Sequence, residues 1–273
     1  MTLSTPPELL SALVAFVLMV GSTSLGIYVR PRLSEQHRSR ETTELMQVTI
    51  ALLVTFAALV LGLLTASVKQ TFDRTAHDRQ AFTLELSILD NCLNNYGSET
   101  APIRDQLHSY VAAVIASTWP DEPKPTGVAI PDTTGMPRVG ASPVLGAIVN
   151  EIGNEINQLA PSTTFQARTL AECIERYAQV LGGRLGVIED ARHDLFEPFY
   201  GILVFWLMIM FACFGLVSPV NTVTGITILL CAVSLSSVIY VIIDLSRPYD
   251  GVFSISSAGM REALTAMLQL SPP

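Results

Sequence analysis

Four long apolar stretches stand out in the pattern of hydrophobic and polar positions along the chain. They contain no Asp, Glu, Lys, Arg or His, and they cover Leu9–Val29, Met46–Val68, Phe199–Val217 and Thr222–Ile243. The hydrocarbon core of a bilayer is about 30 Å thick, and a helix of roughly 20 residues crosses it. Because lipid offers the backbone no hydrogen-bond partner, each stretch must pair its own peptide groups as a helix. The pattern therefore predicts four transmembrane helices, the last two joined as a hairpin by the short turn 218–221.

The distribution of basic residues predicts the orientation of these spans. No Lys or Arg precedes the first span, which argues against a cleaved signal peptide. Four arginines follow it: Arg30, Arg32, Arg38 and Arg40. The positive-inside bias places their loop in the cytoplasm, and four spans then put residues 69–198 and both termini outside. Three basic residues just beyond the second span favour the opposite placement: Lys69, Arg74 and Arg79.

Helical periodicity continues outside the membrane in residues 69–198. Apolar side chains recur every three or four residues at both ends of this segment, which is typical of amphipathic helices. They are Phe82, Leu86, Leu89, Leu93 and Tyr96 after the second span, and Leu170, Ile174, Tyr177, Leu181, Leu185, Ile188 and Leu195 before the third. Ile103–Trp119 and Val144–Leu159 are two shorter amphipathic stretches, and the proline-rich stretch Pro120–Ser142 is predicted to be a loop. Four such helices would bury their apolar faces as an up-down bundle.

We therefore expect an all-α protein, since no stretch shows strand alternation. Its segments are residues 1–68 with two spans, 69–198 as an extramembrane helical bundle, 199–245 with two further spans, and 246–273. Within the last segment, Ser256–Leu270 has the amphipathic pattern of a helix that lies along a membrane surface. The helices that extend spans two and three are expected to run into the bundle without a break.

Composition agrees with a membrane protein and excludes several function classes. The chain has 49% apolar and 15% charged residues and a mean hydropathy of +0.44, whereas soluble domains carry about 25% charge. A net charge of −8 argues against a nucleic-acid partner. There is no phosphate-binding glycine loop, no paired CxxC, no HExxH and no nucleophile–base pair. We therefore expect neither an enzyme nor a cofactor.

Two histidines and several carboxylates fall near the membrane end of the predicted bundle. They are His77 and His193 with Asp73, Asp78, Asp190, Asp194 and Glu197. Imidazole and carboxylate groups can bind divalent metals. Their spacings match no ligand pattern, so a solvated collar of charge is favoured and no metal site is expected.

The four cysteines divide into two pairs. Cys213 and Cys231 lie within spans and are expected to pack as small apolar residues. Cys92 is 24 residues beyond Val68 and Cys173 is 26 residues before Phe199, so both reach nearly the same height on antiparallel helices. A disulfide between them is geometrically possible and would suit an oxidising compartment. Two buried free thiols explain the pattern equally well.

The polar side chains of the spans are mostly hydroxyl groups, and none of them is charged. An ion-coupled carrier usually keeps an ionisable residue in mid-membrane, which disfavours that class, whereas a pore lined by hydroxyls stays compatible. The candidates are Ser22, Thr23, Ser24, Thr55, Thr65, Ser234, Ser236 and Ser237. The favoured alternative is that these hydroxyls bond to carbonyl groups of their own helices.

A polar motif follows the fourth span. Asp244, Arg247 and Asp250 can pair with one another, and Pro248 and Gly251 would turn the chain. In a functional interpretation Arg247 contacts an ion or a lipid headgroup. The structural interpretation, which we favour, is a buried corner that fixes the exit of the helix.

Motifs over most of the chain resemble the bacterial bestrophin-like domain proteins, which are four-pass membrane proteins of unknown function. The first group is Gly62-Leu63-Leu64, Ser67, Lys69, Phe72, Asp73, Leu89-Asp90 and Tyr96-Gly97, and the second is Phe205-Trp206, Phe211, Phe214-Gly215-Leu216, Pro219 and Asn221. The most specific group is Asp244-Leu245, Arg247-Pro248, Asp250-Gly251 and Ile255-Ser256-Ser257. The resemblance implies an oligomeric helical protein of a bacterial inner membrane, and the name implies remote kinship with anion channels. True bestrophins keep their large domain and termini in the cytoplasm, opposite to the orientation predicted above. The resemblance supplies no catalytic residues.

Two function classes follow. The first is a homo-oligomeric ion channel or pore, with membrane lipids and inorganic ions as partners and the bundle as an outer vestibule. The second is a non-conducting sensor or partner-binding protein that acts through its bundle segment, where residues 69–198 hold 17 acidic and 10 basic side chains.

Overall fold

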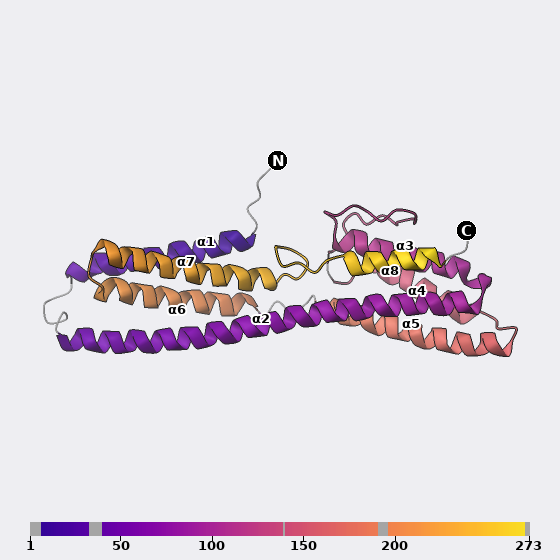
Figure 1. The fold of residues 1–273 in the computed structure, drawn as a ribbon, viewed down its shortest axis with the longest axis horizontal. Helices are drawn as coiled ribbons and strands as arrows, with labels where there is room; N and C mark the ends of the chain where they lie inside the picture. Colours follow the sequence, from indigo (N-terminus) through magenta and orange to yellow (C-terminus); the bar gives the residue numbers. More distant parts are fainter. Residues whose placement is uncertain (1–6, 33–39, 139, 191–195, 271–273) are drawn as a thin grey trace. The chain divides into compact units, whose positions relative to one another are not determined.

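The protein is all-helical throughout the residues that its structure, a computed structural model, describes: 7–32, 40–138, 140–190 and 196–270. Eight α-helices and no strand occur in these ranges (Figure 1). The chain divides into two compact units. The span unit comprises residues 1–72 and 194–253, and the bundle unit comprises residues 73–193 and 254–273. The predicted all-α fold class is confirmed.

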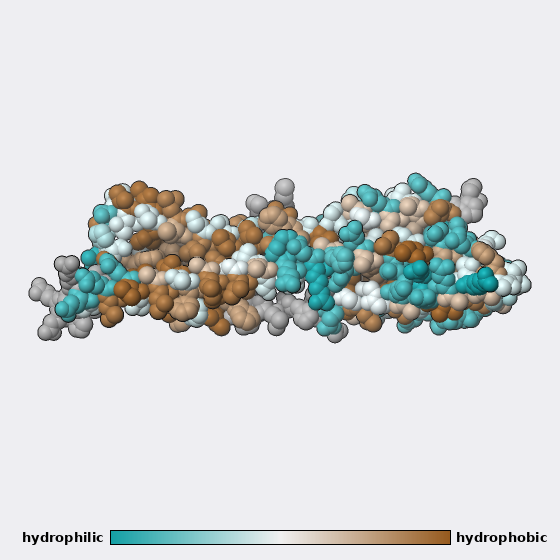
Figure 2. Space-filling view, turned by 60° about the horizontal axis from the view of Figure 1, so that its bottom comes forward, coloured by the Kyte–Doolittle hydropathy of each residue, from teal (hydrophilic) through white to brown (hydrophobic). Residues whose placement is uncertain are grey.

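Each predicted span lies within a helix of the span unit. The helices are α1 (Pro7–Val29), α2 (Arg40–Tyr96), α6 (Phe196–Val217) and α7 (Thr222–Leu245). All four are long and apolar enough to cross a membrane. Their surface is mostly hydrophobic, as the space-filling view in Figure 2 shows. Helix α2 continues as one helix from the second span into the bundle unit, as predicted, whereas the junction before the third span falls at 191–195, outside the described residues.

The core of the span unit forms where α1 packs against α6 and α7, with one face of α2 added. Its most buried large side chains are Met19, Leu203, Leu207, Phe211 and Ile239. The predicted hairpin between α6 and α7 is present. The Asn221 side chain accepts a hydrogen bond from the Thr224 amide (2.8 Å) and so caps α7. Arg30 donates to the Ser218 carbonyl oxygen (2.6 Å) and ties the end of α1 to this turn.

A glycine pair sets the close approach of α1 and α6. A Cβ atom added to Gly26 would lie 3.0 Å from the Cα atom of Gly215 and would collide with the Ala212 carbonyl oxygen. A Cβ atom added to Gly215 would collide with the carbonyl oxygen of Thr23. Small residues of this kind let the backbones of membrane helices pack directly against each other.

Replacing Gly26 with valine is expected to destabilise the span unit by about 1–3 kcal/mol, because the helices must move apart. Gly21→Val is the matched control, since it lies on the same helix with no atom within 4 Å of its added Cβ. Thermal unfolding of the purified protein in lipid nanodiscs measures both effects. Equal losses at the two positions would contradict the close crossing.

The bundle unit contains five helical segments and not the four predicted. They are the end of α2 from Asp73, α3 (Ala101–Thr118), α4 (Pro143–Gln158), α5 (Thr164–Asp190) and α8 (Ala258–Gln269). Helix α3 is the central one, and 13 of its 18 residues are buried. It packs against α4 on one side and α8 on another. The predicted apolar stripe on α2 is confirmed, because all five of its side chains from Phe82 to Tyr96 are buried.

The position predicted for the C-terminal helix is wrong. Helix α8 belongs to the bundle unit, where it packs on α3 and buries Met260, Leu264 and Met267. Its apolar face is therefore occupied by protein and is not free to lie on a membrane surface. The reason is that α3 is buried on nearly all sides, so that it needs a further helix to cover it. Segment 246–273 is accordingly split after Phe253 between the two units.

The predicted apolar stripe of α5 is also partly wrong. Ile174 and Leu185 are exposed, whereas Cys173, Val180 and Val187 form the buried column at intervals of seven residues. The sulfur atoms of Cys92 and Cys173 form a disulfide in the structure, with their Cα atoms 5.6 Å apart. Cys173 belongs to the buried column, so the disulfide lies on the inward face of α5. Leu195, the last member of the predicted stripe, lies outside the described residues.

Candidate functional site

The corner after the fourth span is built around the buried carboxylate of Asp244. Its two oxygens accept hydrogen bonds from the backbone amides of Val252 (2.9 Å) and Phe253 (2.8 Å). Gly251 adopts a φ of 90°, and an added Cβ there would collide with the Asp244 carboxylate. Only glycine adopts this conformation readily. The Asp244–Gly251 motif thus folds the chain back on the end of α7, as the structural interpretation predicted.

Arg247 finds a partner that the sequence did not indicate. Its Nη1 atom lies 2.8 Å from a carboxylate oxygen of Glu8, at the start of α1, and Glu8 is only 3% exposed. The arginine side chain itself remains 46% exposed. Arg247 was expected to pair with Asp244 or Asp250. It pairs instead with Glu8, a residue 239 positions away in the chain. No local pattern could have revealed this ion pair, because its two residues lie at opposite ends of the chain.

The hydroxyls proposed to line a pore bond mostly to their own helices. Thr23 and Ser24 donate to carbonyl oxygens one turn earlier in α1, at 3.2 and 2.9 Å. Thr55 and Thr65 of α2 do the same at 2.9 and 2.7 Å, and Ser237 of α7 donates to the Ser234 carbonyl oxygen at 2.7 Å. These bonds match the alternative that we favoured from the sequence, in which the hydroxyls bond to carbonyl groups of their own helices.

The eight hydroxyl candidates do not converge on one site. Thr23 and Ser24 line a cavity of about 230 Å³ together with the α6–α7 turn and the start of α7. Ser22 is half-buried, whereas Thr55 and Ser234 are exposed on different helices. Ser236 is buried, and its hydroxyl oxygen has no hydrogen-bond partner within the described ranges. A continuous polar path through the described part of a single chain is therefore not formed by these side chains.

A buried cluster of charged groups lies in the bundle unit. The Asp90 carboxylate of α2 accepts two hydrogen bonds from the Arg104 guanidinium of α3, at 2.9 and 3.0 Å. His108 Nε2 lies 2.8 Å from the same carboxylate. Arg104 also donates to the side chain of Asn94 (2.9 Å) and to the Met267 carbonyl oxygen of α8 (3.4 Å). The cluster therefore connects α2, α3 and α8.

Burial alone would raise the pKa of Asp90, but the hydrogen bonds from His108 and Arg104 outweigh it and hold that pKa below its ordinary value. Sequence reasoning missed this cluster. A signal was present, because Asp90 stands in the apolar stripe between Leu86 and Leu93. A charged residue at such a position requires a buried partner.

The predicted collar of histidines and carboxylates lies only partly within the described residues. No group of three or more His, Cys, Asp or Glu side chains gathers there. His77 is exposed, and the side chains of Asp190, His193, Asp194 and Glu197 lie outside the described set. Cys213 and Cys231 of the spans are free thiols.

The four apolar helices and the corner motif define a multi-pass helical membrane protein. Residues 17–260 match the bestrophin-like domain family, and the chain belongs to this family. The resemblance seen in the sequence motifs is thereby confirmed. Neither a curated protein nor a solved structure matches the chain.

Proposed function

We propose that this protein is a subunit of a homo-oligomeric channel that conducts small inorganic ions across a bacterial inner membrane. The exposure of the second span is the observation that carries the proposal. In the most apolar window of α2 only 11% of the residues are buried, against 28–33% in the other three spans. One face of α2 contributes to the core, and the opposite face has no partner within the described chain.

The exposed face of α2 has the spacing of a helix-packing seam. Its largest exposed side chains recur at intervals of three or four residues, and each is more than half exposed: Leu45, Val48, Leu52, Phe56, Leu59 and Leu63. A seam with this heptad-like spacing packs against a similar helix at a small crossing angle. A second copy of the chain carries the same seam, so we assign the interface between subunits to α2.

Ion conduction rests on the composition of the spans together with the family. The spans hold hydroxyls and no charged side chain, which suits passive passage better than ion-coupled transport. Because the hydroxyl candidates of one chain do not converge, the conducting path would lie between subunits. The bestrophin-like name is consistent with an ion channel.

Replacing Leu59 with asparagine is expected to weaken self-association at least tenfold, because the polar group enters the α2 seam. Leu230→Asn on α7 is the matched control, since the two leucines are 60% and 62% exposed. Light scattering of the purified protein across a dilution series measures the assembly. A monomeric wild type, or equal responses of the two variants, would remove α2 from the interface.

Ion flux tests the second half of the proposal. Vesicles reconstituted with an oligomer of verified size are expected to release a trapped salt gradient, and vesicles with Leu59→Asn are expected to release it more slowly. A stable wild-type oligomer that passes no ions would exclude the channel.

A specific observation favours a second candidate, a non-conducting sensor. Helix α2 runs without a break from the span unit into the bundle unit, where a disulfide and the Asp90 cluster fix it to its neighbours. A continuous helix of this kind offers a covalent route by which a change in the bundle would reach the membrane. Lack of ion flux, combined with a partner captured by the bundle and lost on removal of the disulfide, would favour this function.

A further inference from the structure

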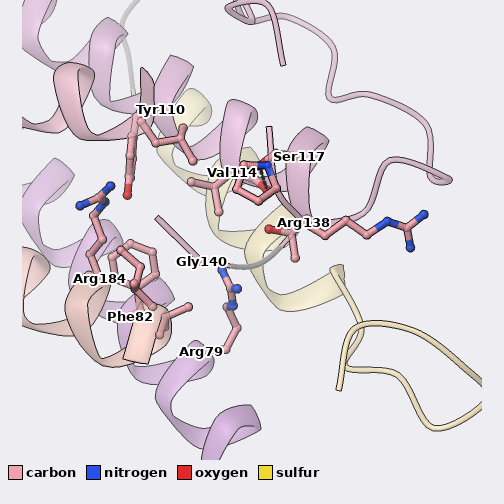
Figure 3. Close-up of a pocket in the computed structure, with 13 residues that line it drawn as sticks. Arg79, Phe82, Tyr110, Val114, Ser117, Arg138, Gly140 and Arg184 are labelled. Carbon is pink, nitrogen blue, oxygen red and sulfur yellow. Dashed lines mark hydrogen bonds between the residues drawn. The ribbon is translucent and has the colours of Figure 1, made fainter. Parts of the chain in front are cut away.

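A small pocket opens within the bundle unit between α2, α3 and α5 (Figure 3). Its cavity measures about 40 Å³, which holds about three water molecules at about 10–15 Å³ each. The polar groups that line it are basic or hydroxylic, and they include Arg79, Tyr110, Ser117 and Arg184. No carboxylate of the described residues belongs to its lining.

Arg184 of α5 is a half-buried cation in the lining of this pocket. Its guanidinium donates to the Ser142 carbonyl oxygen (3.4 Å) and lies beside the Tyr110 side chain in Figure 3, and both neighbours are neutral. Within the described ranges it contacts no carboxylate, although residues 69–198 contain seven more acidic than basic side chains. An arginine keeps its charge at any physiological pH. A half-buried charge without a counter-charge is unfavourable, so an anion in the pocket would stabilise it.

The other lining groups add to this preference for an anion. Arg79 is buried against the same pocket, with its guanidinium 5.6 Å from the centre of the Trp119 ring. Burial raises the pKa of Tyr110 to about 12, despite the opposing effect of Arg184 and Arg79. Tyr110 therefore stays neutral at neutral pH and keeps an O–H that can donate. Arg138, by contrast, points away from the pocket in Figure 3 and pairs with Asp121 (2.8 Å).

We propose that this pocket binds a small oxyanion of the phosphate class, held by Arg184 and Arg79 with the Tyr110 hydroxyl as a further donor. A guanidinium presents parallel N–H groups that match two oxygens of a phosphate group, which favours an oxyanion over a spherical halide. The phosphate group of a lipid headgroup shares this chemistry. The proposal is independent of ion conduction, because the pocket lies wholly in the bundle unit.

Equilibrium dialysis with radiolabelled inorganic phosphate tests the site on the full-length protein in nanodiscs of zwitterionic lipid and excess chloride. The wild type is expected to bind one phosphate per chain, and Arg184→Gln is expected to bind at least tenfold more weakly. Arg176→Gln is the matched control, because it removes the same charge from the same helix at a residue that pairs with Glu172. This control is expected to bind phosphate as the wild type does.

Several outcomes decide the proposal. No phosphate binding by the wild type in excess chloride, or equal binding by Arg184→Gln and Arg176→Gln, would overturn it. Arg184→Lys and Tyr110→Phe keep the fold-supporting bulk and are expected to weaken binding by smaller factors, so the test does not depend on one variant. A repeat in phosphatidylglycerol nanodiscs identifies the source, because loss of free-phosphate binding there assigns the pocket to a lipid headgroup, and unchanged binding assigns it to the free anion.

Discussion

Replacing Asp90 with alanine is expected to destabilise the bundle unit by about 3–5 kcal/mol, because the variant leaves the Arg104 guanidinium buried without its counter-charge. Asp90 is fully buried, and it holds both Arg104 and His108. Thermal or denaturant unfolding of the full-length protein measures the loss. Asp105→Ala, at an exposed neighbour of Arg104, is the control and is expected to cost less than about 0.5 kcal/mol.

The same cluster predicts a dependence on acid. The folded pKa of Asp90 lies below its ordinary value of 3.8, so the unfolded chain takes up the proton first as the pH falls. The stability that the ionised Asp90 carboxylate contributes is therefore complete at pH values above its ordinary pKa. This stability is lost as the pH falls through the lower pKa of the folded state. Unfolding of the wild type is expected to show this loss below about pH 4. The Asp90→Ala variant should be less sensitive in that range, and parallel curves for the two proteins would contradict the argument.

Replacing both Cys92 and Cys173 with serine is expected to destabilise the oxidised protein by about 4.5 kcal/mol. The disulfide joins positions that are 81 residues apart, and closing a loop of this length restricts the unfolded chain by that amount in the chain-entropy treatment. Unfolding of the wild type in a reducing agent should show a similar loss. Cys231→Ser, at an exposed free thiol in α7, is the control and is expected to change little.

The disulfide also bears on the orientation that the arginine-rich loop predicts. Disulfides persist in oxidising compartments and are rare in the cytosol. Protein isolated from cells with thiols blocked at lysis is expected to carry the Cys92–Cys173 bond, which would support placement of residues 69–198 outside the membrane. Isolation of both thiols in reduced form under these conditions would argue for the cytoplasmic side.

The architecture was largely predictable because burial in lipid and in a helical bundle leaves local periodicity. Uncharged stretches of about 20 residues located the four spans, and the apolar stripe from Phe82 to Tyr96 located the bundle end of α2. Counting residues from the membrane brought Cys92 and Cys173 to the same height. It could not decide between a disulfide and free thiols, because height on a helix does not determine which way a side chain faces.

Periodicity also misassigned two helical faces. The residues of α5 that face inward include Cys173 and the half-buried Arg184, and their orientation depends on the neighbouring helices and not on their hydropathy. Helix α8 looked like a membrane-surface helix because an amphipathic pattern records that one face is buried and not what buries it. In the folded protein α3 covers that face.

The sequence by itself determined the number of spans, the helical class, the hairpin turn at Asn221 and the chain reversal at Gly251, because each depends on residues close together in the chain. Only the tertiary structure decided which distant groups meet. Glu8 of α1 pairs with Arg247 in the turn after α7, and Asp90 of α2 pairs with Arg104 of α3. Arg184 of α5 lies beside Tyr110 of α3. Charges and hydrogen-bonding groups carry no local record of their partners, so the candidate sites appear only when the helices are packed.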